Sequence, residues 1–231
     1  MAQILPFKGT MYDAGSGLDL STVLAPPYDV IGPEFQEELH ARSPLNIVRL
    51  ILGYAHGGDT ATDNRYTRAA CFFEEWKKRG ILKTAAVPAI YLYDQEFRVA
   101  GERRVRRGFI ALLKLEDFSA KGVHPHEVTY AEPREDRLSL LRACRANFSQ
   151  VFALYSDERR EVEGALSTAA SAEPLADFVD ENSIRHTLWS VEEKGALREA
   201  AGLMSVKQIV IADGHHRYET DRKSTRLNSS H

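Results

Sequence analysis

The chain has 231 residues, of which 43% are hydrophobic and 27% are charged. These values are ordinary for a globular protein with one large or two small domains, and they exclude a wholly disordered chain. The 30 Lys and Arg residues against 33 Asp and Glu give a formal net charge of −3. The overall charge therefore does not favour binding to nucleic acid or to an anionic membrane.

The sequence carries no signal for secretion or membrane insertion. No apolar run approaches the roughly 20 residues that a membrane-spanning helix needs, and residues 1–7 lack the basic and apolar regions of a signal peptide. Cys71 and Cys144 each fall in a helix-like stretch, which favours two buried thiols over a disulfide. We therefore expect a soluble, cytoplasmic protein.

The first half of the chain predicts helices and strands in alternation. Pro26 and Pro27 predict an extended segment over residues 25–31, and Pro33 can begin a helix that ends at residue 42. The remaining expected elements are a strand at 46–52, a loop at 57–59, a helix at 62–79, and strands at 88–99 and 106–115 joined by a turn at 101–104. Phe72, Phe73 and Trp76 lie on one stripe of the second helix, which indicates core packing.

The second half continues the same alternation. We expect helices at 133–147 and 158–170, strands at 151–155, 185–189 and 207–212, and a helix that begins at a capping box over residues 190–193 and ends at Leu203. The predicted fold class is α/β (mixed α+β), with several short mixed sheets and flanking helices. The expected domains are an N-terminal α/β segment at 1–117 and a segment at 118–220 that begins a longer natural domain.

Residues 221–231 have a different character. They contain one apolar side chain, Leu227, and no helical or strand period. They also match, residue for residue, the translation of a common sequencing-adapter oligonucleotide. We therefore expect a non-native tail, and a natural protein that continues past Thr220.

The strongest functional motif follows the last predicted strand. Asp213, Gly214, His215, His216 and Arg217 occupy a turn and the first turn of an expected helix. Backbone N–H groups at a helix N-terminus bind anions, and Arg and His side chains add donors suited to phosphate oxygens. Asp213 at the strand end can hold a magnesium ion or orient a hydroxyl. The structural alternative is a capped turn with exposed histidines.

A second motif contains His126 and Glu127. Glu127 is a candidate general base, and His126 can orient it or a substrate; the alternative is a loop with a surface carboxylate. Four of the chain's eight histidines lie in or beside the two motifs: His215 and His216 in the first, His126 in the second, and His124 just before it. If the motifs meet in space, they combine a base with an anion-binding turn, which favours phosphoryl transfer.

Six ordered blocks give the chain a family resemblance. They are residues 25–31, 125–129, 136–137 with 141–142, 147–149, 185–189 and 211–220, the last of which reads Ile-Ala-Asp-Gly-His-His-Arg-Tyr-Glu-Thr. Together they resemble the domain-of-unknown-function 1015 family over almost all of residues 1–220. That family has no settled function, and its members are usually longer.

The two functional motifs also resemble those of free serine kinases with the ParB/sulfiredoxin fold. The resemblance implies Glu127 as the base that activates the serine hydroxyl, assisted by His126, and a phosphate-binding turn at Gly214, His215, His216 and Arg217. Asp213 would assist the metal or the transferred phosphoryl group. The implied cofactors are ATP or ADP with Mg²⁺, and no set of protein metal ligands is assigned. The intervening segment, residues 129–210, is longer than in those kinases, so the acceptor stays open.

The leading hypothesis is a nucleotide-dependent small-molecule kinase whose substrate is serine or a similar hydroxylated metabolite. One alternative is a metal-dependent hydrolase, because His124, His126, His215 and His216 can equally bind zinc. The other is a non-catalytic module that senses nucleotides or associates with DNA. The basic run at 103–107 is expected to be a solvated turn, and no membrane or nucleic-acid partner is expected.

Overall fold

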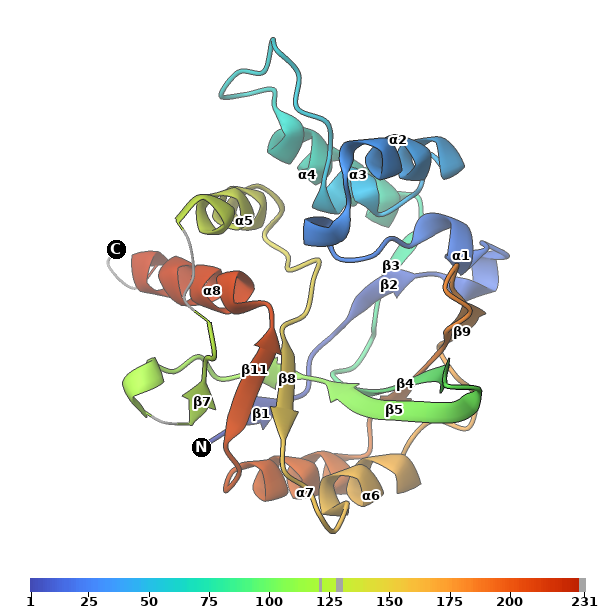
Figure 1. Cartoon of the computed structure of the whole chain (residues 1–231), viewed down its shortest axis with the longest axis vertical. Helices are drawn as coiled ribbons and strands as arrows, with labels where there is room; N and C mark the ends of the chain where they lie inside the picture. The colour runs from blue at the N-terminus through green and yellow to red at the C-terminus, as the bar shows by residue number, and fades with distance from the viewer. Residues whose placement is uncertain (121, 128–130, 229–231) are drawn as a thin grey trace. The chain divides into compact units, whose positions relative to one another are not determined.

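The computed structural model describes residues 1–120, 122–127 and 131–228 (Figure 1). The chain divides into two compact units. Unit 1 comprises Met1–Ala14, Thr84–His126 and Phe152–Asp213; unit 2 comprises Gly15–Lys83, Glu127–Val151 and Gly214–His231. Each unit is thus assembled from three separate stretches of the chain. The fold class is mixed α/β, as the alternation of elements predicts. Val128 and Thr129 of the second sequence block lie outside the described residues.

Unit 1 contains the larger sheets. Four antiparallel strands stand in the order β5-β4-β10-β9: β5 (Glu102–Ile110), β4 (Ile90–Val99), β10 (Arg185–Val191) and β9 (Ala176–Val179). A second sheet has the order β7-β11-β8, formed by β7 (Val123–His124), β11 (Ile209–Asp213) and β8 (Phe152–Tyr155). β11 runs parallel to β7 and antiparallel to β8. A third pair joins β1 (Ile4–Leu5) to β6 (Leu112–Leu113). The sheets are therefore short and mixed, as expected.

The hairpin between β4 and β5 corrects two predictions. Its turn is formed by Ala100 and Gly101, both with positive φ (51° and 83°), so β5 begins at Glu102 and the predicted turn residues 102–104 belong to the strand. The basic run therefore lies in a strand rather than in a solvated turn, although its side chains are exposed. Arg107 makes a two-point contact with Asp94, through Nε to Oδ1 at 2.7 Å and through Nη2 to Oδ2 at 2.5 Å. Cross-strand pairing, rather than solvation alone, thus orders these arginines.

Two helices complete unit 1: α6 (Glu161–Thr168) and α7 (Lys194–Met204), which contact each other. The predicted capping box at 190–193 is wrong, because β10 continues through Val191. The N-cap of α7 is instead Glu193, whose carboxylate accepts hydrogen bonds from the backbone N–H of Gly195 and Ala196. A strand that pairs on both sides prevails over a local capping signal here.

Unit 2 is helical. Its main helices are α2 (Pro33–Arg42), α4 (Arg65–Lys78), α5 (Ala131–Cys144) and α8 (His215–Asn228), with the short helices α1 (Leu20–Val23) and α3 (Val48–Ile51). α5 contacts both α4 and α8. Part of the core lies between α4 and α5, where Ala69, Leu140 and Cys144 are buried. Trp76 and Phe73 are also buried, which confirms the predicted apolar stripe of this helix. Cys71, in contrast, is exposed, so the expectation of two buried thiols is wrong.

Two predictions in the first part of unit 2 are wrong. The expected strand at 46–52 is the short helix α3, because the buried side chain of Asn46 accepts from the N–H of Val48 and donates to the carbonyls of Thr22 and Leu24. A short apolar run does not distinguish a strand from a buried helical turn. The expected extended segment contains a 3₁₀ turn at Tyr28–Val30, preceded by extended Pro27.

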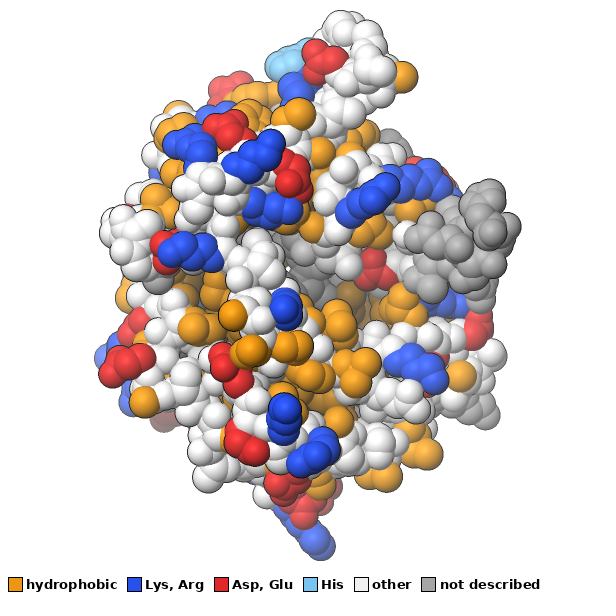
Figure 2. Space-filling model, turned by 180° about the vertical axis from the view of Figure 1, so that it is seen from behind, with side chains coloured by type: hydrophobic (Ala, Val, Ile, Leu, Met, Phe, Trp, Pro, Cys, Tyr) orange, Lys and Arg blue, Asp and Glu red, His pale blue; other side chains and the backbone are white. Residues whose placement is uncertain are grey.

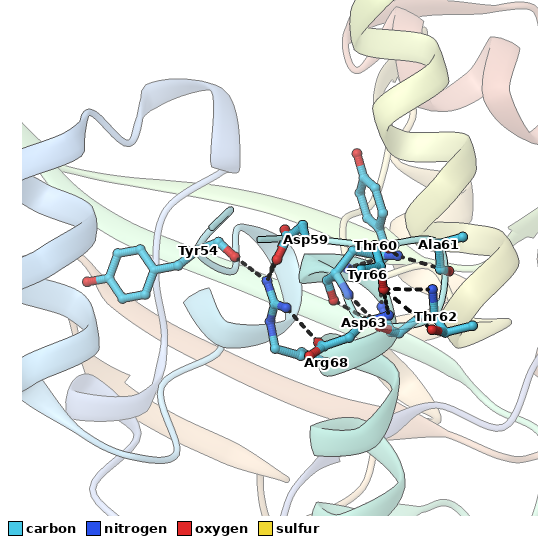
Figure 3. Close-up of polar contacts among 10 residues, drawn as sticks. Tyr54, Asp59, Thr60, Ala61, Thr62, Asp63, Tyr66 and Arg68 are labelled. Carbon is cyan, nitrogen blue, oxygen red and sulfur yellow. Dashed lines mark hydrogen bonds and ion pairs between the residues drawn. The ribbon is translucent and has the colours of Figure 1, made fainter. Parts of the chain in front are cut away.

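The loop before α4 is held by one arginine. Arg68 donates to the carbonyl of Tyr54 at 2.9 Å and makes ion pairs with Asp59 and Asp63 (Figure 3). Asn64 then caps α4 by accepting from the N–H groups of Tyr66 and Thr67. The segment before α4 is therefore fixed by side chains rather than by sheet pairing, and it delivers Arg65 and Tyr66 in a defined orientation.

α8 extends further than the sequence predicts. The expected non-native tail begins at Asp221, but the helix continues through Asn228. No Gly or Pro interrupts this stretch, and Arg, Lys and Leu are good helix formers, so helical propagation needs no apolar period.

The strand β3 (Leu82–Thr84) contains residues of both units, since Lys83 is the last residue of its stretch of unit 2 and Thr84 belongs to unit 1. Within unit 1, the Thr84 hydroxyl lies 2.8 Å from that of Thr10 in β2 (Thr10–Tyr12).

The surface carries charges of both signs. On the face drawn in Figure 2, basic and acidic side chains are interspersed, with hydrophobic side chains between them. Among the described residues, no helix is long and apolar enough to cross a membrane.

Candidate functional site

The turn before α8 requires glycine. Gly214 has a φ of +90°, which residues with a side chain rarely adopt. A Cβ at this position would stand 3.0 Å from Nε and 3.1 Å from Cζ of Arg217, so the guanidinium lies directly against the glycine backbone. Arg217 also donates from Nη1 to the carbonyl of Gln150. Glycine thus gives Arg217 its place over the first turn of the helix.

Glu127 and His215 come together in unit 2. Nδ1 of His215 lies 3.8 Å from Oε2 of Glu127. The His215 side chain is 4% exposed, whereas that of Glu127 is 65% exposed. The carboxylate of one predicted motif therefore meets the first histidine of the other, and it remains accessible from solvent.

The other predicted residues are divided between the two units. In unit 1, Nε2 of His126 lies 3.2 Å from the carbonyl oxygen of Ala212, and Asp213 is exposed at the end of β11. In unit 2, His216 is partly buried, and its carbonyl accepts from the Thr220 hydroxyl at 2.7 Å. His126 is thus oriented toward the strand that precedes the turn, as a positioning residue would be.

A second cationic group lies on α5. Arg137 is 8% exposed and donates from Nη1 to the carbonyl of Ile51 at 2.9 Å. It donates from Nε to Oδ2 of Asp136 at 2.7 Å, and its Cζ lies 3.7 Å from the centre of the Tyr28 ring. The guanidinium is therefore fixed on an edge by hydrogen bonds and on a face by an aromatic ring.

The carboxylate of Asp136 makes ion pairs with two arginine side chains. Its Oδ1 accepts from Arg65 and, at 2.8 Å, from the hydroxyl of Tyr66, while Oδ2 pairs with Arg137. Burial raises the pKa of Tyr66, and Asp136 raises it further, so the hydroxyl stays protonated and can donate. One carboxylate is shared by two guanidinium groups, which leaves a net positive charge at this position.

α5, α8 and the segment after α5 enclose a small pocket. The polar side chains that line it are Arg137, Asn147, Ser149, Arg217 and Thr220, and the apolar ones are Leu140, Leu141, Ala146 and Phe148. Arg137, Leu140 and Leu141 have the spacing of one helix face. No carboxylate belongs to this lining in the described part of unit 2.

The pocket contains functional candidates that sequence reasoning missed. Arg137, Asn147 and Ser149 are all absent from the predicted site, and so is Tyr28. The signal was nevertheless present, because these residues belong to the blocks at 25–31, 136–137 with 141–142, and 147–149 that carry the family resemblance. The block at 185–189, in contrast, lies on β10 in unit 1.

His186 in that block has its own polar network. Its Nδ1 lies 2.5 Å from the Tyr93 hydroxyl, and its Nε2 lies 3.1 Å from Oδ2 of Asp180. The ring stacks on Phe178 with centroids 4.8 Å apart. These contacts tie β9 and β4 to β10, which is a structural role.

The histidines of the zinc alternative come from both units: His124 and His126 from unit 1, and His215 and His216 from unit 2. Among the residues that the structure describes, no group of three or more His, Cys, Asp or Glu side chains is placed to hold a metal ion. The carboxylate of Asp213 at the end of β11 is an oxygen group of the kind that Mg²⁺ prefers.

Comparison with known proteins gives one result. Neither the curated proteins nor the solved structures include a significant match to the chain. The sequence model of the family described as "Protein of unknown function (DUF1015)" matches residues 4–230. This match covers nearly the whole chain, and we conclude that the chain belongs to the DUF1015 family.

Proposed function

We propose that the chain is a nucleotide-dependent small-molecule kinase that transfers a phosphoryl group from ATP or ADP, with Mg²⁺, to a hydroxyl group, free serine being the first acceptor to test. The observation that carries the proposal is the contact between Glu127 and His215 beside the Gly214 turn. It places an accessible carboxylate next to a glycine turn at a helix N-terminus.

The turn has the properties of a phosphate-binding element. α8 begins at His215, so the positive end of its helix dipole lies at this turn. Gly214 lets a ligand approach the backbone, and Arg217 lies beside it with a planar set of donors. His215 and His216 add further donors at the same end of the helix.

Glu127 is suited to act as the base. The acceptor hydroxyl loses its proton to Glu127 while its oxygen bonds to the terminal phosphorus, and the bond from that phosphorus to the bridging oxygen breaks. The products are the phosphate ester and ADP, or AMP when ADP is the donor. His126 and His215 would hold the catalytic segment, and Asp213 would hold Mg²⁺.

The test is product formation with and without the Glu127 carboxylate. The protein is incubated with ATP or ADP, Mg²⁺ and a panel of hydroxylated metabolites that includes serine, and phosphate esters are measured by mass spectrometry. Glu127→Gln is expected to lower the rate by about 10²-fold or more. The matched control is Glu37→Gln, because Glu37 is an exposed carboxylate on α2 of the same unit.

Each outcome decides between the hypotheses. Full activity of Glu127→Gln with every acceptor overturns the proposed role of the carboxylate. If the protein binds nucleotide but forms no product, the result favours the hypothesis of a nucleotide-sensing module. If the purified protein contains a stoichiometric transition metal, the result favours the metal-dependent hydrolase. A cytoplasmic location is part of the proposal, because both cysteines are free thiols.

A further inference from the structure

The pocket between α5 and α8 is distinct from the Gly214 turn. Thr220 lies three positions after Arg217, so the two residues share a face of α8, and the pocket extends along the helix away from its N-terminus. Arg217 belongs to both places: its guanidinium lies against Gly214 and also lines the pocket. A ligand in the pocket is therefore adjacent to whatever the turn holds.

The pocket is preorganised for an anion. Ile51, Asp136 and the Tyr28 ring fix the guanidinium of Arg137 on three sides. Arg217 is fixed by the carbonyl of Gln150 and by Gly214. Two guanidinium groups held in place lose little conformational entropy when they bind an anion. Asp136 already engages Nε and Nη2 of Arg137, so a bound carboxylate would meet the remaining N–H groups of this guanidinium.

The charge near the pocket is positive. The lining contributes two arginines, and the one carboxylate of Asp136 is shared between Arg137 and Arg65. The Asn147 amide donates to Oδ2 of Asp221 at 3.4 Å. Burial raises the pKa of that carboxyl, while the hydrogen bond from Asn147 opposes the rise.

The size of the pocket limits what it can hold. Its cavity volume is ≈ 30 Å³, and one water molecule needs about 10–15 Å³ in this measure, so the cavity holds only a few heavy atoms. A terminal carboxylate fits such a space, whereas a nucleoside does not. The hydroxyls of Ser149 and Thr220 and the amide of Asn147 supply further hydrogen-bonding groups around the rim.

We propose that this pocket binds the carboxylate of the phosphoryl acceptor, so that the acceptors are small hydroxy acids rather than uncharged alcohols. The inference rests on the proposed function, because the bound molecule is a phosphoryl acceptor only if the chain is a kinase. Binding of the carboxylate can nevertheless be measured without nucleotide. Arg137 and Arg217 hold the carboxylate, and the hydroxyl of the same molecule extends toward the Gly214 turn.

The test places a negative charge in the pocket without disturbing the Arg137 network. Ser149 follows α5 in a loop and is only partly buried, so Ser149→Asp and Ser149→Asn are both accommodated and differ in charge alone. Binding of D-glycerate and L-serine is measured by calorimetry in parallel with glycerol and inorganic phosphate. Ser205→Asp adds the same charge at an exposed position after α7 in unit 1 and controls for net charge.

The expected result is that glycerate and serine bind the unmodified protein, and that Ser149→Asp weakens this binding about ten-fold or more relative to Ser149→Asn. Ser205→Asp should bind like the unmodified protein. Glycerol, which is uncharged, should show no dependence on the charge at position 149. Arg137→Lys, which keeps the charge but loses the fork, should also weaken hydroxy-acid binding.

The outcomes separate the pocket from the kinase. If the hydroxy acids bind in this pattern but no phosphate ester forms, the pocket is supported and the kinase fails. If esters form equally from glycerol and glycerate in Ser149→Asp and Ser149→Asn, the kinase survives and the pocket inference fails. Binding of inorganic phosphate alone overturns the inference by assigning the pocket to nucleotide phosphates, and binding of no probe at millimolar concentration also overturns it.

Discussion

The guanidinium of Arg137 lies 3.7 Å from the centre of the Tyr28 ring, although the two residues are far apart in the sequence. Tyr28 belongs to a 3₁₀ turn after two prolines, and Arg137 lies in the middle of α5. Burial raises the pKa of Tyr28, while the positive charges of Arg137 and Arg217 oppose that rise. The ring is therefore a neutral face against which a cation is held.

Two substitutions of Tyr28 should distinguish the contribution of its ring to stability from that of its hydroxyl. Tyr28→Leu is expected to destabilise the chain by about 0.5–2 kcal/mol through loss of the cation–π contact, and Tyr28→Phe by less, because the ring remains. The measurement is the free energy of unfolding from urea titration. Equal losses in the two variants would show that the hydroxyl, and not the ring, is what stabilises Arg137.

The accuracy of the sequence predictions depended on how local the signal was. The predicted helix at 33–42 coincides with α2, because Pro33 fixes the first turn and the signal lies within the helix itself. The expected strand at 46–52 failed because its outcome depends on hydrogen bonds from Asn46 to the carbonyls of Thr22 and Leu24, more than twenty residues earlier. β9 had no prediction, since it becomes a strand only by pairing with β10.

The residues of the candidate site also divide into those with a local sequence signal and those that depend on distant contacts. Residues 213–217 are adjacent in sequence, so their chemistry is visible as a motif, and the contact between Glu127 and His215 was an explicit condition of the hypothesis. Arg137, Asn147 and Ser149 were missed because an arginine on a helix or a serine in a loop carries no local signal of function. Only the packing of α5 against α8 brings them to Arg217.

Gly214→Ala should lower the free energy of unfolding of the chain. A side chain at a φ of +90° is strained, and the new Cβ would displace Arg217, so we expect a loss of about 1–3 kcal/mol in stability. Gly164→Ala is the matched control: it lies inside α6 with open space around it, and it should stabilise the chain by about 0.5–1 kcal/mol. Urea unfolding of both variants makes the comparison. A neutral effect at position 214 would mean that the turn tolerates another backbone conformation.

Asp180 should make stability depend on pH in unit 1. Burial alone would raise the pKa of this carboxyl, but hydrogen bonds from the N–H of Ile184, from His186 and from the N–H of Asn182 outweigh it and leave the pKa below 3.8. Because the folded-state pKa is depressed, the stabilisation is complete above the unfolded-state pKa and is lost as the pH falls through the folded-state pKa.

Asp180→Asn tests that dependence directly. The variant should be less stable than the unmodified chain by about 1–3 kcal/mol near neutral pH, and the difference should shrink in acid below pH 3.8. Glu173→Gln removes an exposed carboxylate from the same unit and should show no such change. The free energy of unfolding is measured for each protein across this range, and a difference that stays constant with pH would assign the effect of Asp180 to shape rather than to charge.

The two cysteines should differ sharply in reactivity. Cys71 is exposed on α4, whereas Cys144 is 7% exposed in the core between α4 and α5, and burial raises its pKa to about 11. The thiolate is the reactive form, so near neutral pH iodoacetamide should modify Cys71 and leave Cys144 unmodified in the folded protein. Peptide mass spectrometry gives the extent at each site, and Cys71→Ser should remove nearly all native labelling. In denaturant both thiols should react at similar rates. Rapid labelling of Cys144 under native conditions would indicate that the α4–α5 core opens, and with it the helix that positions Arg137.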